Sequence, residues 1–467
     1  MTENIVKISQ IIDARRLDPI FFRTGYVIFK DKFPLAPLKS FCLYFQSGFG
    51  AGKGDQTTEE NGIIQIRPTN IDNEGILKYD RNVYVPATSN KPMLEYDDVL
   101  FNNTNSQELV GKTAILKENK KLFFSNHITQ IKVDKSKANP DYLWIVLNIY
   151  QKKNIFYSIC TNWNNQSGVG IELLKSIQVP LPPLKTQQEI VNIYNKANQA
   201  KKNKEQEAQP LLDSIDNYLL RELGIELPTK TSSVENKYFN RKINFFFGKR
   251  YDPYYHQPFF EHAFSAIEKT LFEKKFLGKI TTIITSGITP LSGGDAYISS
   301  QKGIPFVRSG DININGDINF EELLYLKPEI HNGKMKSSRL QKNDILIAIV
   351  GATIGQVGVY KYDREANINQ AIALVRLQDG INYEYVKEFI KSPIGQLNLD
   401  RLKRPVARAN INLEEIASIR VVLPPLEKQN EIANGIQTIR VKAQQLQTEA
   451  SLLLAEAKKE IEKIILG

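Results

Sequence analysis

A glycine-rich stretch near the start of the chain is the first place where residue types and spacing could support chemistry. Residues 47–54 are Ser-Gly-Phe-Gly-Ala-Gly-Lys-Gly, similar at first sight to the loop that cradles phosphates in nucleotide-binding enzymes. That loop begins with Gly and follows its lysine with Ser or Thr, whose hydroxyl reaches the magnesium ion. Here Ser47 and Gly54 occupy those two positions. ATP binding is therefore not predicted, and the stretch is either a ligand-facing loop or a plain turn between strands.

Two further catalytic patterns fail as well. A magnesium-dependent nuclease core needs an Asp followed by Glu-x-Lys on a strand, and Asp98 with Glu118-Asn119-Lys120 fits it loosely. So short a pattern arises often by chance, and the second half of the chain has no equivalent. The Pro-Pro pairs at 182–183 and 424–425 lack the polar and aromatic neighbours of a methyltransferase motif. Two Cys and four scattered His offer no zinc cluster, disulfide framework or catalytic triad. We predict a non-catalytic chain without a metal or cofactor of its own.

The elements that must position any binding residues occur twice. Residues 179–190 (Val-Pro-Leu-Pro-Pro-Leu-Lys-Thr-Gln-Gln-Glu-Ile) match residues 421–432 (Val-Val-Leu-Pro-Pro-Leu-Glu-Lys-Gln-Asn-Glu-Ile). Each copy ends a strand-like run on a double proline, which has no N–H for a sheet or a helix interior. An Arg-x-Asp-Pro turn, at 16–19 and at 250–253, precedes each globular region and is predicted to cap a corner of it. A unit of more than about 200 residues is therefore duplicated.

Each double proline precedes a long segment with helical spacing. Over residues 427–466 the apolar positions recur with a period of 3.5, which predicts a seam for a partner helix. Residues 185–223 have the same skeleton, weakened by Lys201 and Lys204 and with a kink expected at Pro210. We predict that the two helices pack antiparallel, each spanning about 60 Å at about 1.5 Å per residue. The alternative is that each seam lies on its own domain.

The regions between these anchors contain short strand patterns, glycine turns and one short helix each, at 141–151 and 383–391. Such spacing is typical of an α+β fold with a curved or barrel-like sheet. The predicted fold class is thus α+β, with two pseudo-repeated α/β domains separated by an antiparallel pair of long helices. The predicted boundaries are a first domain at 1–180, a helical region at 181–226, a linker at 227–248, a second domain at 249–423 and a second helical region at 424–467.

Composition limits the partners. The 467 residues carry a net charge of +10, with an isoelectric point near 9.1, which favours a polyanion such as nucleic acid. No apolar window is long enough to span a membrane and no signal peptide opens the chain, so a cytoplasmic location without membrane contact is expected. Two similar domains at a fixed separation suit double-stranded DNA with two half-sites, about one turn or roughly 34 Å apart. Because the halves differ in sequence, the target should be bipartite and asymmetric.

These features together resemble the specificity (S) subunit of type I restriction-modification enzymes. The resemblance covers essentially the whole chain. It is carried by the Leu-Pro-Pro-Leu to Glu-Ile exits (181–190 and 423–432), the Ser-Gly-Ile-Thr-Pro loop at 286–290, the Gly303 to Asp311 strand and the Gly-Ala-Thr-Ile-Gly turn at 351–355. The first domain departs further from the family pattern than the second. This difference bears on which bases are recognised and not on the class of protein.

The resemblance implies two target-recognition domains, each followed by a helical region, and no chemistry in this chain. It implies recruitment of two methyltransferase (M) subunits, which use S-adenosylmethionine. Two restriction (R) translocase-nuclease subunits, which depend on ATP and Mg²⁺, are implied as well. Exposed helix faces are the candidate partner-binding residues, and they are Gln187, Gln188, Glu189, Gln429, Asn430 and Glu431.

Base recognition needs planar side chains: Arg for guanine, and Asn or Gln for adenine, whereas Lys and Arg hold phosphates. Such residues occur in both halves, in the polar loop before the strand that leads into each long helix and at aligned strand ends. The glycine-rich loop at 47–54 is a further candidate to face DNA. The predicted DNA-binding residues are Lys53, Arg67, Asn126, Asn162, Asn164, Asn165, Gln166, Arg308, Asn369, Gln370, Arg404 and Arg408. Arg308 and Asn369 could equally be structural.

Three alternatives stay open on the sequence alone. The first is the specificity subunit of a type IIB restriction-modification enzyme, which also has two domains. The second is a bifunctional nuclease or methyltransferase, and the third is a coiled-coil scaffold. The recognised bases, the gap length and the methylated base are not encoded in any pattern visible in the sequence.

Overall fold

The computed structural model divides the chain into two compact units. Unit 1 comprises Met1–Glu205 with Thr448–Gly467, and unit 2 comprises Gln206–Gln447. The first Arg-x-Asp-Pro turn and most of the predicted linker lie outside the residues that the structure describes. These are 32–88, 90–163, 166–229, 238–240, 242–243, 250–291, 294–313, 315–404 and 409–467.

Within its described residues, unit 1 contains small sheets and three short helices. Its central antiparallel sheet has the order β2 (Cys42–Ser47), β9 (Ile128–Val133), β5 (Val99–Asn102), β7 (Thr113–Ile115). A second sheet has the order β4 (Tyr84–Pro86), β3 (Gly62–Ile66), β8 (Phe123–Phe124), and a third β10 (Thr161–Trp163), β11 (Gln166–Gly168), β6 (Thr104–Asn105). β1 (Leu35–Pro37) pairs with β12 (Gln178–Pro180). The short helices are α3 (Pro140–Lys152), α4 (Ile155–Ile159) and α5 (Ile171–Ser176).

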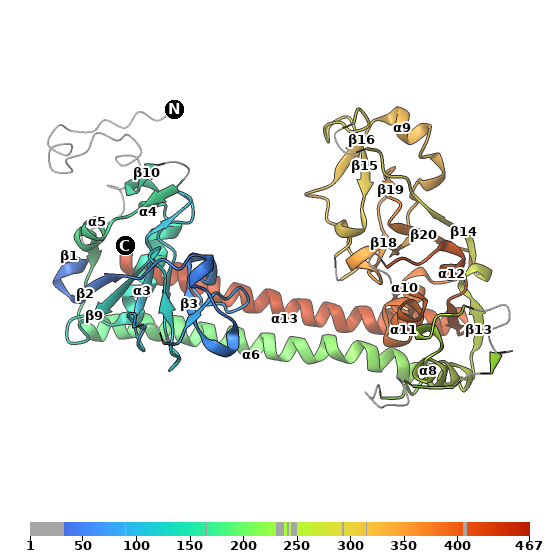
Figure 1. Cartoon of the computed structure of the whole chain (residues 1–467), viewed down its shortest axis with the longest axis horizontal. Helices are drawn as coiled ribbons and strands as arrows, with labels where there is room; N and C mark the ends of the chain where they lie inside the picture. Colours follow the sequence, from blue (N-terminus) through green and yellow to red (C-terminus); the bar gives the residue numbers. More distant parts are fainter. Residues whose placement is uncertain are drawn as a thin grey trace. The chain divides into compact units, whose positions relative to one another are not determined.

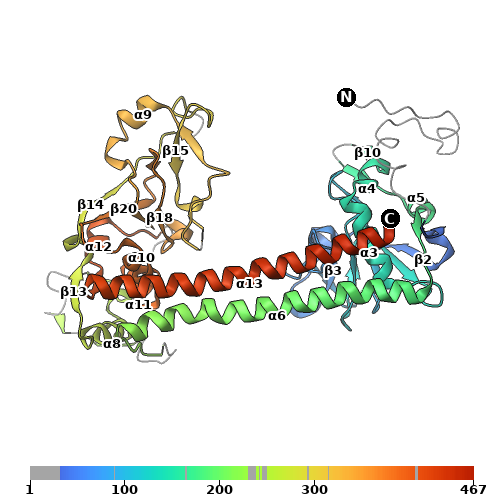
Figure 2. The same ribbon diagram turned by 180° about the vertical axis from the view of Figure 1, so that it is seen from behind.

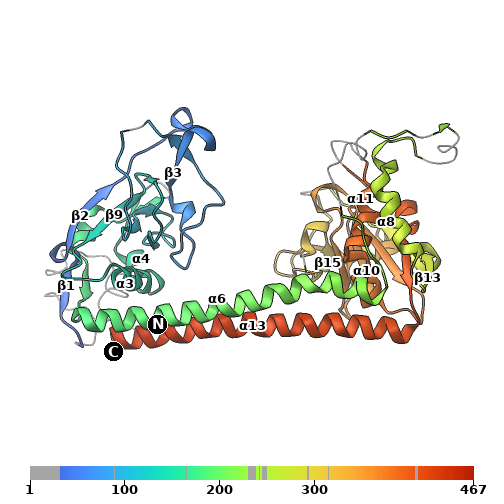
Figure 3. The same ribbon diagram turned by 90° about the horizontal axis from the view of Figure 1, so that it is seen from below.

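Alternation along the central strands creates the layers of unit 1. In β5, Val99 and Phe101 join the core beneath α3, whereas Leu100 between them joins a separate core shared with β3 and β8. Successive strand residues point to opposite faces, so both faces of this sheet are buried. Figure 3 shows the result, with α3 on one side of β9 and β3 on the other.

Unit 2 repeats this plan. Its central sheet has the order β14 (Thr281–Ser286), β20 (Ile372–Leu377), β17 (Asp344–Ala348), β18 (Val357–Tyr360). The second sheet has the order β16 (Leu324–Leu326), β15 (Ile304–Val307), β19 (Asn367–Ile368), and β13 (Glu273–Phe276) pairs with β21 (Arg420–Leu423). The short helices are α8 (Pro258–Glu268), α9 (Pro328–Asn332), α10 (Tyr383–Lys391), α11 (Pro393–Leu402) and α12 (Leu413–Ala417).

The duplicated α+β fold is confirmed, but the sheet is not one curved barrel. In unit 2 the alternation is the same: Ile345 and Ile347 of β17 face the helices, and Leu346 faces the second sheet. Figure 1 shows β15, β16 and α9 on one side of β20, with α10 and α11 on the other. Because each central sheet is buried on both faces, every unit forms stacked layers of helices, sheet and sheet.

Two long helices complete both units. α6 (Leu184–Glu222) follows the first double proline and α13 (Leu426–Leu466) follows the second. In unit 1, Ile190 at the start of α6 shares a core with Ile461 near the end of α13, which lies beside α3 (Figure 2). In unit 2, Leu219 near the end of α6 shares a core with Ile436 near the start of α13. The pairing is therefore antiparallel, as predicted.

The predicted seam accounts for the helix pairing. Ala443 and Ala450 are fully buried, and the small side chains let the helix backbones approach closely. Lys204, expected to weaken the seam, instead pairs with Glu449 of α13 at 2.5 Å. α6 continues unbroken through Pro210, an exposed position where the carbonyl that loses its partner can be hydrated. No helix among the described residues is long and apolar enough to cross a membrane.

A buried glutamine ties each long helix to the short helix before it. The Oε1 atom of Gln187 accepts the backbone N–H of Asn139 at 2.8 Å, and its amide donates to the Pro182 carbonyl at 2.8 Å. Gln429 does the same with Asn382, at 3.0 Å, and with Pro424, at 2.8 Å (all donor–acceptor distances). The first proline of each pair thus supplies a carbonyl as hydrogen-bond acceptor, and the pair also marks the start of a long helix.

These hydrogen bonds correct the prediction that Gln187 and Gln429 bind a partner subunit. Gln187 is fully buried and Gln429 is 3% exposed, so neither side chain is available to a partner. Exposed Gln188 and Asn430 accept the side-chain amides of the same two asparagines, at 3.0 and 2.6 Å. Among the predicted partner-binding residues, Glu189 and Glu431 are exposed acids, and Glu431 pairs with Lys428 at 2.8 Å. The repeated Gln was predicted from its place on a polar helix face, whereas tertiary packing buries it.

Replacing Gln429 by Ala is expected to destabilise the chain by about 1–3 kcal/mol. The substitution leaves the Asn382 N–H and the Pro424 carbonyl buried without partners. Glu189→Ala is the control and should change the free energy of unfolding by less than about 0.5 kcal/mol, because Glu189 is exposed. Denaturant unfolding of both variants measures the difference, and equal effects would show that the tie contributes nothing.

Candidate nucleic-acid interface

In unit 1 the glycine-rich loop is seated on the end of β8. Phe49 donates its backbone N–H to the Phe124 carbonyl at 3.1 Å, and Asn126 donates to the Phe49 carbonyl at 3.2 Å. A Cβ at Gly48 would lie 2.0 Å from the Phe124 carbonyl oxygen, so only glycine permits this approach. In unit 2 a Cβ at Gly287 would meet the Ile368 carbonyl oxygen at 1.7 Å in the same way. Each loop is therefore held against the end of a strand, β8 in unit 1 and β19 in unit 2, and is more than a turn between strands. We call this strand end with its loop the edge of the unit.

This seating creates a pocket of about 290 Å³ in unit 1. Arg67 lies in it, at the end of β3, with Nε donating to Oε1 of Gln65 at 3.0 Å and Nη2 to the Ala51 carbonyl at 2.8 Å. Gln65 in turn donates to the Phe49 carbonyl at 2.8 Å. Loop and strand thus hold the guanidinium by neutral acceptors. Asn126, another predicted DNA-binding residue, lines the same pocket.

Arg308 occupies the matching position in unit 2 but is neutralised. Its Nε and Nη2 atoms donate to the carboxylate of Asp311, at 3.1 and 2.8 Å. Asn70 stands where Asp311 would be in unit 1, and it caps the same turn by accepting the Arg67 backbone N–H at 3.0 Å. The hydrogen bonds and charge of Asp311 raise the pKa of Arg308, whereas burial lowers the pKa of Arg67. The two arginines are therefore in different electrostatic settings, and Arg308 is held within the fold.

A three-stranded hairpin sheet continues the edge of unit 1. Asn103 links the two parts, because its amide donates to the Asn126 carbonyl at 3.3 Å while its own carbonyl accepts the Val169 N–H at 2.9 Å. The hairpin carries the predicted residues Asn162 and Gln166, both exposed. Asn162 accepts the Ser167 hydroxyl at 2.6 Å, which fixes its amide. Asn164 and Asn165 lie outside the described residues.

Two predicted residues of unit 2, Asn369 and Gln370, lie at the corresponding strand end. Gln370 is exposed beside Asn369, whose side chain accepts the Ala371 N–H at 3.2 Å and whose carbonyl accepts the Gly287 N–H at 3.3 Å. Asn369 therefore shapes the turn, and Gln370 remains the candidate for base contact. Lys53, the remaining candidate of unit 1, is exposed on the glycine-rich loop.

Arg404 is engaged within the fold. Its Nη2 atom pairs with Glu415 at 2.9 Å, and Nη1 donates to the Asn410 side chain at 3.2 Å. Glu415 also accepts Arg250 of the second Arg-x-Asp-Pro turn, at 3.1 Å, so this turn caps a corner as predicted. Arg408 lies outside the described residues.

Trp163 and Ser125 were not among the predicted DNA-binding residues, although Trp163 lies within one of the candidate polar loops. Trp163 is 47% exposed on the hairpin, with Gly168 beneath its ring. An aromatic within an Asn-rich loop is a signal that could have been used, because exposed aromatic rings are common where bases stack. Ser125 is buried at the pocket and nothing in its sequence context distinguishes it.

The nuclease-like pattern at Asp98 is structural. Asp98 is fully buried and accepts Nζ of Lys132 at 2.9 Å and the Glu95 N–H at 2.6 Å. Asp344 at the same position of unit 2 holds Arg376 through two hydrogen bonds, at 2.8 and 2.7 Å. The shared Asp therefore joins the central strands, and its recurrence follows from the duplicated fold.

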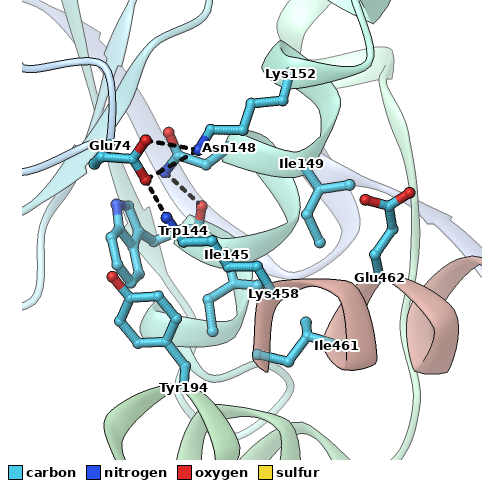
Figure 4. A pocket seen from close by; sticks show the side chains of 10 residues that line it. All are labelled: Glu74, Trp144, Ile145, Asn148, Ile149, Lys152, Tyr194, Lys458, Ile461 and Glu462. Atoms are coloured by element: carbon cyan, nitrogen blue, oxygen red, sulfur yellow. Dashed lines mark hydrogen bonds and ion pairs between the residues drawn. The ribbon is translucent and has the colours of Figure 1, made fainter. Parts of the chain in front are cut away.

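Figure 4 shows a second pocket of unit 1, of about 70 Å³, where α13 meets α3. Glu74 accepts Lys152 at 3.0 Å and also pairs with Lys458 of α13. Trp144 donates its indole N–H to the Thr113 carbonyl at 3.0 Å and packs edge-on against Tyr194, with ring centroids 4.9 Å apart. The charged side chains that line this pocket are paired within the protein, so we interpret the pocket as a packing joint between α3 and α13.

Known proteins match both repeats. The family model for the type I restriction modification DNA specificity domain matches residues 53–209 and 270–452. A Methanocaldococcus jannaschii protein, named as the MjaX specificity subunit of a type I restriction enzyme, is 26% identical over 73% of this chain and 71% of its own length. The EcoBI specificity subunit of Escherichia coli is 31% identical over 33% of this chain and 32% of its own length.

A solved structure supports the fold. A chain from work on complex assembly and conformational transition of the type I R-M system has a TM-score of 0.50 at 15% identity, covering 94% of this chain and 97% of its own. The class defined by fold and edge is thus a two-domain DNA specificity protein. The chain belongs to the family of type I restriction-modification specificity subunits, which contribute recognition and no catalysis. These matches favour type I over the type IIB and enzyme alternatives.

Proposed function

We propose that the chain recognises an asymmetric bipartite DNA target and recruits methyltransferase and restriction subunits to it. One observation carries the proposal: two copies of one frame present different side chains at the same edge. Unit 1 offers Arg67 and the hairpin with Asn162 and Gln166. Unit 2 offers Gln370, and its Arg308, which corresponds to Arg67, is neutralised by Asp311. Different donors and acceptors on an equivalent edge select different bases.

The long helices support the bipartite arrangement. α6 and α13 are continuous elements of 39 and 41 residues, and each contributes to both units. In this proposal they set the gap between half-sites, so the gap has a fixed length and an unspecified sequence. S-adenosylmethionine, ATP and Mg²⁺ would be held by the M and R partners, and a cytoplasmic location follows from a chromosomal substrate.

Mapping of methylated positions tests the function. Genomic DNA is exposed to the chain reconstituted with its methyltransferase partner and S-adenosylmethionine, and modified sites are aligned. The expected result is two short, different sequence blocks at one constant spacing. A single continuous block, or a palindrome, would contradict the proposal. Turnover of DNA by the isolated chain with Mg²⁺ and S-adenosylmethionine would refute the non-catalytic assignment.

A further inference from the structure

The pocket around Arg67 has hydrogen-bond donors to spare. Nε and one N–H of Nη2 are used, which leaves the N–H groups of Nη1 and the second N–H of Nη2 without an acceptor among the described residues. Across the described ranges of the chain, no carboxylate pairs with Arg67. The acidic side chain directly after the glycine-rich loop, Asp55, accepts the Gly52 N–H at 2.9 Å. The guanidinium is therefore a fixed positive charge without an internal counter-charge.

Ser125 supplies a second, independent observation. It is 3% exposed and lines the pocket, yet its Oγ atom has no hydrogen-bond partner within the part of the protein that the structure describes. An unsatisfied buried hydroxyl typically costs about 1–3 kcal/mol, so its retention at the pocket points to an external partner. The buried hydroxyl of Ser125 and the fixed guanidinium of Arg67 together indicate a negatively charged ligand with several hydrogen-bond acceptors.

We propose that this pocket grips one backbone phosphate of the DNA, and that Arg67 positions unit 1 without selecting a base. The geometry favours a phosphate over a base edge. Side chains that recognise bases must project into a groove, whereas Arg67 is half-buried and held back by Gln65 and Ala51. A recessed pocket lined by glycine backbone suits a group that protrudes from the duplex.

The corresponding position in unit 2 does not suit an anion, because the carboxylate of Asp311 already pairs with the guanidinium of Arg308. Asn70 in place of Asp311 thus leaves the arginine of unit 1 without a paired carboxylate. The two units then contact DNA unequally, because the phosphate anchor at Arg67 has no counterpart at Arg308. This inference rests on DNA as the ligand in the proposed function and adds which chemical group the pocket takes.

Arg67→Gln in the full-length chain tests the proposal. We expect affinity for target and for scrambled duplex to fall by the same factor, about tenfold for a lost charge-assisted contact. The slope of log affinity against log salt should drop by about one. Arg81→Gln, which removes an exposed charge of unit 1 outside the pocket, is the matched control and should have a smaller effect.

Methylphosphonate substitution identifies the atom. Neutralising phosphates one at a time should reveal one position that weakens the wild type and leaves Arg67→Gln unaffected. Ser125→Ala should weaken DNA binding without lowering the melting temperature, because its hydroxyl has no internal partner. Loss of affinity for target duplex alone would assign Arg67 to a base and overturn the proposal, as would an effect no larger than that of Arg81→Gln. If the wild type binds both duplexes equally but Arg67→Gln still weakens both, the phosphate site stands and the proposed sequence recognition fails.

Discussion

Replacing Glu388 by Ala is expected to destabilise unit 2 by about 3–5 kcal/mol, because removing one member of a buried ion pair leaves the other charge buried and unpaired. Glu388 is 4% exposed on α10. Its carboxylate accepts both Nη atoms of Arg440 on α13, at 2.5 and 2.6 Å, and pairs with Lys387 at 2.8 Å. Lys387 is as buried as Glu388 but also pairs with Glu384, so Arg440 is the cation that would lose its carboxylate partner. Guanidinium unfolding of the variant gives the magnitude.

The control is an ion pair of unit 2 at the surface. Lys342 and Asp363 pair at 2.7 Å with side chains 51% and 77% exposed, so Lys342→Ala should cost less than about 1 kcal/mol. A second comparison comes from unit 1, where Trp144 and Ile145 stand at the positions of Lys387 and Glu388 and fill the joint with apolar atoms. A result for Glu388→Ala no larger than for the control would mean that water reaches the pair.

The same pair gives a pH dependence. Burial alone would raise the pKa of Glu388, but the hydrogen bonds and charges of Arg440 and Lys387 outweigh it and lower the pKa to about 2. A carboxylate whose pKa is lower in the folded than in the unfolded state stabilises the fold above the unfolded pKa, about 4.3. This stability is lost as the pH falls from there towards 2. The Glu388→Ala variant should therefore lose less stability than the wild type over that interval.

Gly48→Ala is expected to cost about 3 kcal/mol or more and to weaken DNA binding at the same time. The added Cβ would lie 2.0 Å from the Phe124 carbonyl oxygen and 2.6 Å from that of Ser125. Both are backbone atoms that cannot rotate away, so the loop must leave the strand end. Since the Ala51 carbonyl on this loop holds Arg67 at 2.8 Å, the displacement should release the guanidinium.

Gly54→Ala is the matched control in the same loop. A Cβ there meets nothing within 4 Å, so stability should change by less than about 0.5 kcal/mol. Thermal unfolding and DNA affinity are measured on both variants. Full DNA affinity in Gly48→Ala would show that the seated loop is not needed for binding, even if stability falls as expected.

Much of the architecture could be predicted because it depends on local rules that are repeated. A double proline ends a strand wherever it occurs, and a 3.5-residue apolar period requires a partner helix. Both signals occur twice, so the duplicated α+β fold and the antiparallel helices followed without any contact being known. The stacking of two sheets did not follow, because alternation shows that both strand faces are buried but not what covers each face.

The candidate site was predicted less completely, because sequence gives residue type and not counter-charge or burial. Arg67 and Arg308 are aligned arginines, and only the fold shows that Asp311 neutralises one of them. Gln187 has the type expected of a partner-facing helix, and only packing against Asn139 buries it. The sequence by itself therefore determined the duplication, the helices and the class of protein. Tertiary structure decided which polar groups are paired within the protein and which stay exposed, because that depends on contacts between segments distant in the chain.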